Sequence, residues 1–129
     1  MLNTNQAAPG FSLPNQRNEI VSLSDFKGKK HVVLYFYPKD DTPGCTIQAN
    51  QFTALAGEFA KHDTVVLGVS RDSCESHRAF ITKFGLQVAL LADTSGELCN
   101  HYGVWQEKEK NGVKSMGIVR STFLIDKAG

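Results

Sequence analysis

Short apolar runs alternate along this chain with longer segments in which apolar residues recur every three or four positions. Three runs rich in valine and leucine cover residues 31–37, 64–70 and 88–93. Such short, continuously apolar runs are typical of strands that are buried on both faces of a parallel sheet. A fourth run, at 121–126, follows a polar, glycine-containing segment at 107–117 that we interpret as a surface loop.

The segment after the first run has helical spacing. Phe52, Leu55 and Phe59 recur at helical intervals within residues 45–62, which predicts one helix that faces the core. A shorter helix is predicted over 95–103.

A further helix is predicted over 71–85. Asp72 and Glu75 have the spacing of a capping box at its start, and Gly85 is a suitable stop. Near the N-terminus, two short apolar pieces separated by polar turn residues within 11–23 predict a hairpin.

Strands that alternate with helices predict an α/β fold with a central, mostly parallel sheet flanked by helices, here with an N-terminal hairpin. The chain has 129 residues, of which 41% are hydrophobic. This length fits a single domain that spans residues 1–129.

Composition narrows the classes of function. The net charge is +1, and the 14 basic and 13 acidic residues are mixed along the chain. No nucleic-acid or membrane partner is therefore expected. The first ten residues lack the features of a secretory signal, no run is long enough to span a membrane, and three cysteines do not form a disulfide scaffold. We therefore expect a cytoplasmic protein.

The three cysteines follow the three predicted parallel strands. Cys45, Cys74 and Cys99 come after the first, second and third strand respectively. Ligands of open α/β sheets collect at the carboxyl ends of the strands. We therefore expect all three thiols near one edge of the sheet.

The stretch YPKDDTPGCT, which contains Cys45, has the residues of a helix start. Thr42 suits the N-cap, Pro43 suits the first helical position, and Gly44 allows close backbone approach. Cys45 then lies in the first turn, where free N–H groups and the helix dipole favour a thiolate.

Two carboxylates in the same stretch oppose that effect. Asp40 and Asp41 precede Cys45 closely, and a negative charge near a thiol disfavours its ionisation. A cation is therefore expected beside Cys45, with Lys39 and Arg120 as the candidates. An ordinary turn followed by a helix start that contains an unreactive cysteine is the alternative.

The segment PKDDTPGC matches the Pro-x-x-x-Thr-x-x-Cys motif of peroxiredoxins, and YFYPKDDTPGCT resembles their bacterioferritin-comigratory branch, also called peroxiredoxin Q. The segments APGFSLPN, GVSRDSCESHRAF and GIVRSTFLID are similar to that branch as well. The resemblance implies a thioredoxin-like fold. It also implies a thiol peroxidase that reduces hydrogen peroxide and organic hydroperoxides without metal or bound cofactor.

The resemblance also implies roles for individual residues. Cys45 would be the peroxidatic nucleophile, and Thr42, Pro38 and Arg120 would be the other catalytic residues. Thr42 would hold the peroxide, Pro38 would exclude water, and Arg120 with the backbone at Gly44 and Cys45 would stabilise the leaving oxygen. The Cys45 sulfenic acid would be returned to the thiol by thioredoxin or glutaredoxin, and the protein would be a monomer.

The resemblance leaves three possibilities for resolution of the sulfenic acid. Many members of the branch carry it five residues after the peroxidatic cysteine, where this chain has Asn50. Cys74 is the first candidate, although it precedes the position near Ile81 that a related subgroup uses. A one-cysteine cycle comes next, then Cys99, for which we prefer the interpretation as a small core residue.

Three further observations leave alternatives open. Cys74 with His77, and Cys99 with His101, could contribute zinc ligands, although their spacing is unlike that of common zinc modules and both histidines fit exposed helix positions. A non-enzymatic redox sensor or holdase would use the same reactive Cys45. Members of the branch continue past the last predicted strand, so the domain is expected to lack the usual C-terminal strand and helix.

Overall fold

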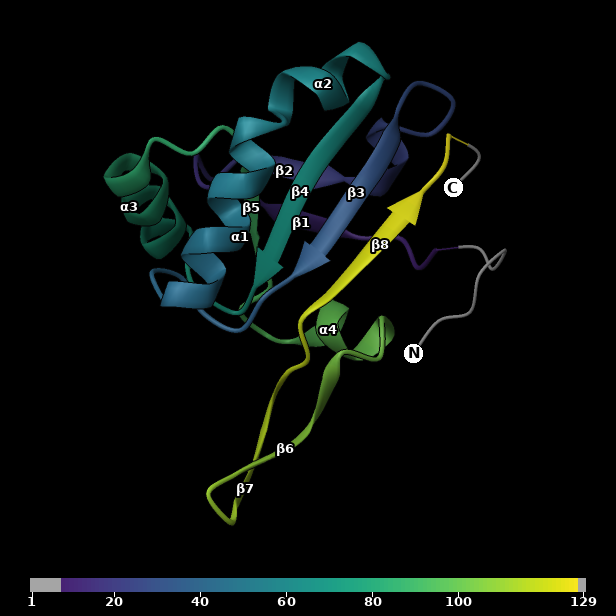
Figure 1. Cartoon of the computed structure of the whole chain (residues 1–129). Coiled ribbons are helices and arrows are strands. Elements are labelled where there is room, and N and C mark those ends of the chain that lie inside the picture. Colours follow the sequence, from purple (N-terminus) through teal and green to yellow (C-terminus); the bar gives the residue numbers. More distant parts are fainter. Residues whose placement is uncertain (1–7, 128–129) are drawn as a thin grey trace.

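The computed structural model describes residues 8–127, and its centre is a four-stranded sheet in the order β5-β4-β3-β8 (Figure 1). Three of its strands are parallel, and the edge strand β8 runs antiparallel to β3. Their bounds are β3 His31–Phe36, β4 Thr64–Ser70, β5 Ala89–Ala92 and β8 Ser121–Ile125. The predicted mostly parallel sheet is confirmed. The N-terminal segment 1–7, in which no secretory signal is predicted, and residues 128–129 lie outside the described part of the chain.

Side chains of the central strand alternate between two cores. Val33 and Tyr35 of β3 belong to a cluster with Cys45 on one face of the sheet. Leu34 and Phe36 belong to a second cluster, which includes Cys99, on the other face. This alternation follows from the two-residue period of a strand. We refer to these two sides as the Cys45 face and the Cys99 face.

Three helices lie on the Cys45 face, namely α1 (Pro43–Ala54), α2 (Ala56–Lys61) and α3 (Cys74–Phe84) (Figure 1). The prediction of one continuous helix over 45–62 is wrong. The helix is interrupted at Leu55, which has φ −99° and ψ 3°, and α1 and α2 lie on either side of it. The break leaves Phe52 and Phe59 packed together, with ring centroids 6.1 Å apart. Leu55 is 49% exposed and does not face the core.

The start of α3 also differs from the prediction. Ser73, not Asp72, is the N-cap, and its hydroxyl accepts a hydrogen bond from the Ser76 amide at 3.1 Å. Asp72 instead accepts hydrogen bonds from the Ser70 hydroxyl and from the backbone N–H of Asp40, at 2.7 and 2.8 Å. The Asp72–Glu75 capping box is therefore wrong, because Asp72 is engaged by another loop.

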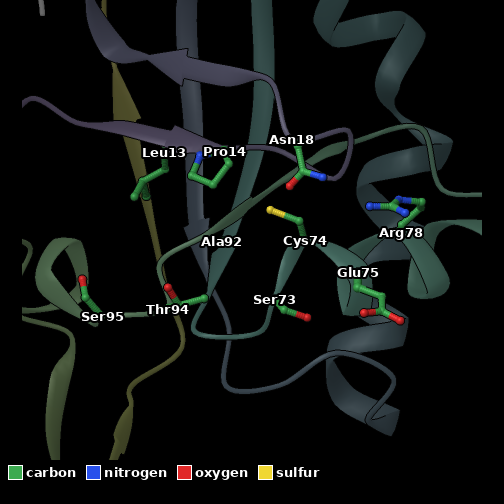
Figure 2. A pocket seen from close by; sticks show the side chains of 10 residues that line it. All are labelled: Leu13, Pro14, Asn18, Ser73, Cys74, Glu75, Arg78, Ala92, Thr94 and Ser95. Carbon is green, nitrogen blue, oxygen red and sulfur yellow. The ribbon is translucent and has the colours of Figure 1, made fainter.

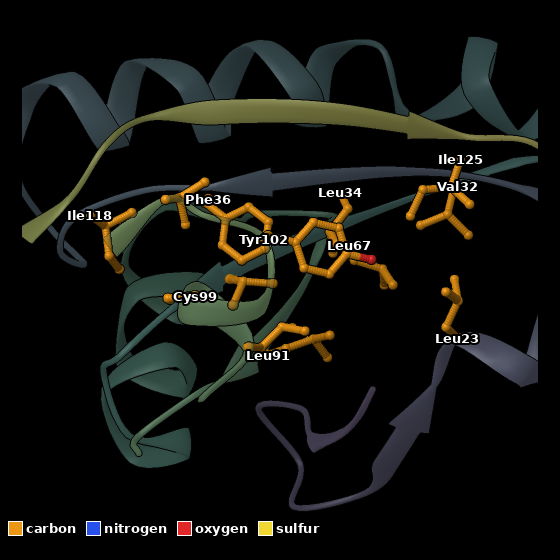
Figure 3. Packing of buried hydrophobic residues seen from close by; sticks show 13 residues of the cluster. Leu23, Val32, Leu34, Phe36, Leu67, Leu91, Cys99, Tyr102, Ile118 and Ile125 are labelled. Atoms are coloured by element: carbon orange, nitrogen blue, oxygen red, sulfur yellow. The ribbon is translucent and has the colours of Figure 1, made fainter. Parts of the chain in front are cut away.

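The Cys99 face is covered by shorter elements. The predicted N-terminal hairpin is confirmed as β1 (Ser12–Pro14) paired with β2 (Ile20–Ser22), and a 3-10 turn, η1 (Leu23–Asp25), follows it. The predicted short helix is α4 (Glu97–His101). Figure 3 shows buried side chains of η1, of α4 and of the sheet, with Tyr102 in their midst.

The segment interpreted as a loop is a second hairpin, so that prediction is wrong. Strands β6 (Trp105–Lys110) and β7 (Val113–Ile118) pair along their length and extend away from the main sheet (Figure 1). Asn111 and Gly112 connect them with φ values of 54° and 77°, as a two-residue hairpin turn requires. Trp105 is partly buried and lies under the guanidinium of Arg71, whose Cζ is 4.6 Å from the ring centroid.

Within the described residues, none of the helices is both long and apolar enough to cross a membrane.

Candidate active site at the start of α1

The first turn of α1 places Cys45 against the sheet. Pro43 occupies the first turn of the helix, and Thr42 precedes it in an extended conformation. Cys45 is only 2% exposed and packs in the same core as Ala49, which lies one turn later. The N–H groups of the first helical turn have no acceptor within the helix. Cys45 lies in this turn and is therefore close to the positive end of the helix dipole.

A guanidinium lies directly beside this sulfur. Arg120 Nη2 donates to Cys45 Sγ at 3.1 Å, and Arg120 Nη1 donates to Gln48 Oε1 at 2.7 Å. Arg120 comes from the link between β7 and β8, 75 residues along the chain from Cys45. Of the two cations considered from the sequence, Arg120 therefore contacts the thiol, whereas Lys39 is exposed.

Gly44 leaves room for that contact. A Cβ atom at this position would lie 3.2 Å from Arg120 Nη2. That separation is tighter than ordinary van der Waals contact, so a side chain would press on the guanidinium. The glycine thus serves the close approach of Arg120 to Cys45.

Thr42 uses its hydroxyl differently from an ordinary N-cap. The side chain makes no capping hydrogen bond to the helix and donates instead to the Lys39 carbonyl oxygen at 2.9 Å. A hydroxyl has one proton and two lone pairs. The Thr42 oxygen is therefore left as an acceptor. Pro38, the remaining motif residue, is exposed on the same loop.

The two carboxylates near Cys45 are both paired elsewhere. Asp41 lies 2.8 Å from Lys83 Nζ at the surface. Asp40 is buried and contacts Tyr37, Ser76 and His77. Their pairing explains how a thiol and two aspartates share one short stretch.

The structure contradicts the predicted position of His77. We expected an exposed or capping helix residue, but its side chain is fully buried, with 0% exposure. Its Nδ1 lies 2.7 Å from Asp40 Oδ2, and its Nε2 lies 2.9 Å from the Leu91 carbonyl oxygen. His77 precedes Phe80 by three positions on α3, which puts it on the buried stripe of that helix.

Burial and charge together affect Tyr37 beside this pair. Burial first, and the neighbouring Asp40 carboxylate second, raise the pKa of the Tyr37 phenol well above its ordinary value. The phenol therefore stays protonated at neutral pH and donates to Asp40 Oδ1.

Cys74 lies in a pocket of its own. It is partly exposed, and Figure 2 shows its sulfur directed towards Pro14 and Asn18 of the N-terminal hairpin. The pocket has a volume of about 600 Å³, and its other side includes Ala92 and Thr94. None of its lining residues belongs to α1. Cys74 and Cys45 thus face different surroundings.

Cys99 lies on the opposite face of the sheet, among Phe36, Leu91 and Tyr102 (Figure 3). It has 0% exposure, and its backbone N–H donates to Asp93 Oδ2 at 2.9 Å. Burial first, and then the Asp93 carboxylate, raise the pKa of the Cys99 thiol far above its ordinary value. The three cysteines follow the strand ends as predicted, but the sheet separates Cys99 from Cys45.

The zinc interpretation is disfavoured by the positions of the histidines. Both ring nitrogens of His77 have protein partners, while His101 is half-exposed at the end of α4. Between residues 8 and 127, no group of three or more histidine, cysteine, aspartate or glutamate side chains has a metal-ligating arrangement.

The sequence analysis missed Gln48 and the contact between Asp40 and His77. Gln48, which orients Arg120, lies one turn after Gly44 on α1, so helical spacing could have suggested it. The Asp40–His77 contact joins residues 37 positions apart, and no local pattern signals such a pair.

Comparison with known proteins agrees with this geometry. The model of the AhpC/TSA family matches residues 4–129. A putative peroxiredoxin bcp of Coxiella burnetii is 49% identical over 96% of this chain and 82% of its own length. Peroxiredoxin Bcp of Bacillus subtilis is 49% identical over 96% and 78%.

Solved structures give the same answer. The bacterioferritin comigratory protein of Xanthomonas campestris superposes with a TM-score of 0.86 at 40% identity, covering 92% of this chain and 75% of its own. Peroxidoxin BcpB of Mycobacterium tuberculosis gives 0.86 at 33% identity, covering 98% and 80%.

The expected thioredoxin-like fold is therefore confirmed, and so is a thiol-dependent peroxidase that takes a peroxide and is recycled by a thiol reductant such as thioredoxin. No finding supports the alternative of a non-enzymatic sensor or holdase. On its sequence, its fold and the arrangement around Cys45, the chain belongs to the AhpC/TSA family, among the bacterioferritin-comigratory peroxiredoxins.

Proposed function

We propose that Cys45 is the peroxidatic nucleophile and that Arg120, Thr42, Gly44 and Pro38 complete the site. The observation that carries this assignment is the contact of 3.1 Å between Arg120 Nη2 and Cys45 Sγ at the start of α1. A cation and a helix N-terminus both favour a thiolate, which is the reactive form of cysteine.

The thiolate attacks one oxygen of a hydroperoxide, so that an S–O bond forms while the O–O bond breaks. Sulfur is oxidised to the sulfenic acid, and the second oxygen leaves as hydroxide or alkoxide and takes a proton from water. Negative charge grows on that oxygen. The guanidinium of Arg120 and the first-turn amides near Gly44 are donors for it.

Thr42 holds the substrate in this scheme. Because its hydroxyl proton is committed to the Lys39 carbonyl, its oxygen accepts the O–H of the incoming hydroperoxide. Pro38, which is exposed on the same loop, limits the access of water to the site around Cys45. The related protein from Xanthomonas campestris is described as reducing alkyl peroxides. We extend that substrate class, together with hydrogen peroxide, to this chain.

We assign resolution of the sulfenic acid to Cys74. Its thiol is partly exposed, whereas Cys99 is fully buried on the other face and its raised pKa keeps it protonated and weakly nucleophilic. A disulfide needs Cα atoms within about 7 Å, so we expect the first turns of α1 to unwind before Cys45 meets Cys74.

The remaining assignments concern partners and location. We propose thioredoxin as the reductant, with glutaredoxin as the second candidate, and a monomer as the working form. The three free thiols suit a reducing compartment, which favours the cytoplasm.

The test uses Cys45→Ser, Cys74→Ser and Cys99→Ser beside the wild type. Single-turnover peroxide consumption should vanish only in Cys45→Ser. Mass spectrometry after one equivalent of peroxide should find a Cys45–Cys74 disulfide in the wild type and in Cys99→Ser. Peroxide consumption by Cys45→Ser would remove the assignment of the nucleophile. If Cys74→Ser still turns over normally with thioredoxin, the assignment of Cys74 as the resolving cysteine is wrong, and a one-cysteine cycle takes its place.

A further inference from the structure

A buried polar cluster holds the loop that precedes the active-site helix. Asp40, only 7% exposed, accepts hydrogen bonds from the Tyr37 phenol and, at 2.8 Å, from the Ser76 hydroxyl. Its Oδ2 also faces His77 Nδ1 at 2.7 Å. We call these four residues, Tyr37, Asp40, Ser76 and His77, the Asp40 clamp. It joins the end of β3 to the first turns of α3.

The histidine of the clamp is fixed at both ends. The Leu91 carbonyl oxygen can only accept a hydrogen bond, so His77 Nε2 carries a proton. One further proton lies between His77 Nδ1 and Asp40 Oδ2, whichever of the two atoms holds it. Loss of either partner would remove a buried hydrogen bond from the other. Asp40 therefore has one preferred position.

The position of Asp40 sets the orientation of Thr42 through a single peptide group. The carbonyl of the Lys39–Asp40 peptide accepts the Thr42 hydroxyl at 2.9 Å, and the N–H of the same peptide donates to Asp72 Oδ2 at 2.8 Å. Because the peptide group is planar, its two hydrogen bonds cannot be reoriented separately. A shift of Asp40 would move the acceptor that orients the Thr42 hydroxyl.

The next residue shows how tightly this loop is held. Asp41 has φ 57°, in the left-handed region that residues other than glycine seldom occupy. It lies between the clamped Asp40 and the N-cap residue Thr42. A conformation of this kind persists where the surrounding contacts hold it in place.

We propose that Asp40 and His77 are positioning residues for the reaction with peroxide: they fix the Lys39–Asp40 peptide so that the Thr42 oxygen is offered as an acceptor to the hydroperoxide. The inference rests on the proposed role of Thr42 and goes beyond it, since the hydrogen bonds of the pair lead to other groups and the partner of the Cys45 sulfur is Arg120. Aligning a bound reactant is worth orders of magnitude in rate.

The experiment compares two reactions of the same thiol. Rate constants of Cys45 with hydrogen peroxide and with iodoacetamide are measured at one pH for the wild type, Asp40→Ala and His77→Ala. Iodoacetamide needs the thiolate but makes no use of an acceptor at Thr42. We expect the peroxide rate to fall about tenfold to a hundredfold. The alkylation rate should not fall in Asp40→Ala, because loss of the carboxylate can only favour the thiolate, and it should stay within about twofold of the wild type in His77→Ala.

Conservative variants keep the test usable if those proteins fold poorly. Tyr37→Phe and Ser76→Ala each remove one hydrogen bond to Asp40 and should lower the peroxide rate by a smaller factor. Asp40→Asn retains an acceptor for Tyr37 and a donor for neutral His77, so it should recover most of the rate lost in Asp40→Ala.

Two controls separate the possible outcomes. Tyr102→Phe removes a partly buried hydrogen bond on the Cys99 face and should leave the ratio of the two rates unchanged. Thr42→Val should lower that ratio at least as much as Asp40→Ala. If Thr42→Val lowers it and the clamp variants do not, the positioning role is wrong while the proposed site stands. If Thr42→Val also leaves it unchanged, the role of Thr42 is wrong. Equal losses in both reactions would show that the clamp is merely structural.

Discussion

Two cysteines are buried on opposite faces of one sheet, and the charged groups beside them have opposite sign. Cys45 is 2% exposed and Cys99 is 0% exposed, so burial does not distinguish them. Cys45 accepts a hydrogen bond from the Arg120 guanidinium, while Cys99 lies beside the Asp93 carboxylate. The charge of the nearest partner therefore distinguishes the two thiols, and this difference supports the proposed role of Cys45 as the nucleophile.

The first prediction removes the cation from the Cys45 face. Arg120→Met should lower the single-turnover rate with peroxide by about 10²–10³, as the loss of a well-placed donor does in other enzymes. Stopped-flow fluorescence or competition with a second peroxidase measures the rate. Arg71→Met is the matched control, because Arg71 lies over Trp105 outside the site. A loss of less than threefold in Arg120→Met would contradict the role of the guanidinium.

The second prediction concerns the Cys99 face at alkaline pH. The folded protein holds the Cys99 proton to a higher pH than the unfolded chain does, because burial and Asp93 raise its pKa. The resulting stability is fully present below about pH 8.5, where unfolded cysteine titrates, and decreases above it by about 1.4 kcal/mol per pH unit. Tyr102, whose pKa burial raises to about 12, adds a similar loss above about pH 10.

Urea unfolding between pH 7 and 10 checks this slope. Cys99→Ala should be less stable at neutral pH because it leaves a small cavity, but its stability should fall less steeply above pH 8.5. Parallel curves for Cys99→Ala and the wild type would show that Cys99 ionises normally, and the contrast between the two thiols would fail.

A third prediction concerns the orientation of Arg120. Gln48→Ala leaves the guanidinium beside Cys45 without its second acceptor, so the peroxide rate should fall roughly fivefold, which corresponds to about 1 kcal/mol. The same kinetic assay applies. Gln51→Ala, an exposed change on the same helix, should have no effect. Equal rates in the two variants would mean that Arg120 needs no support.

The smallest prediction compares one tyrosine from each face. The Tyr35 hydroxyl, on the Cys45 face, is buried without a hydrogen-bond partner among the described residues, whereas the Tyr102 hydroxyl donates to the Pro9 carbonyl at 2.8 Å. Tyr35→Phe should therefore stabilise the protein by about 1 kcal/mol, and Tyr102→Phe should destabilise it by a similar amount. Thermal unfolding measures both, and shifts of the same sign would contradict the comparison.

Local patterns were enough for most of the fold. The apolar runs located all four strands of the main sheet. Three of them are buried parallel strands, which are continuously apolar, and the antiparallel edge strand β8 has a short apolar run of its own. The hairpin at 105–118 was missed because its strands are largely polar and exposed. Its Asn111–Gly112 turn was the one local signal that could have found it.

By itself, the sequence determined the position of Cys45 at a helix start and the need for a nearby cation, because caps and first-turn amides act over a few residues. Only the tertiary structure decided that Arg120 is that cation, that Cys99 is on the far face, and that His77 is buried against Asp40. These contacts join residues far apart in the chain. Their geometry depends on strand order and packing, which no local pattern encodes.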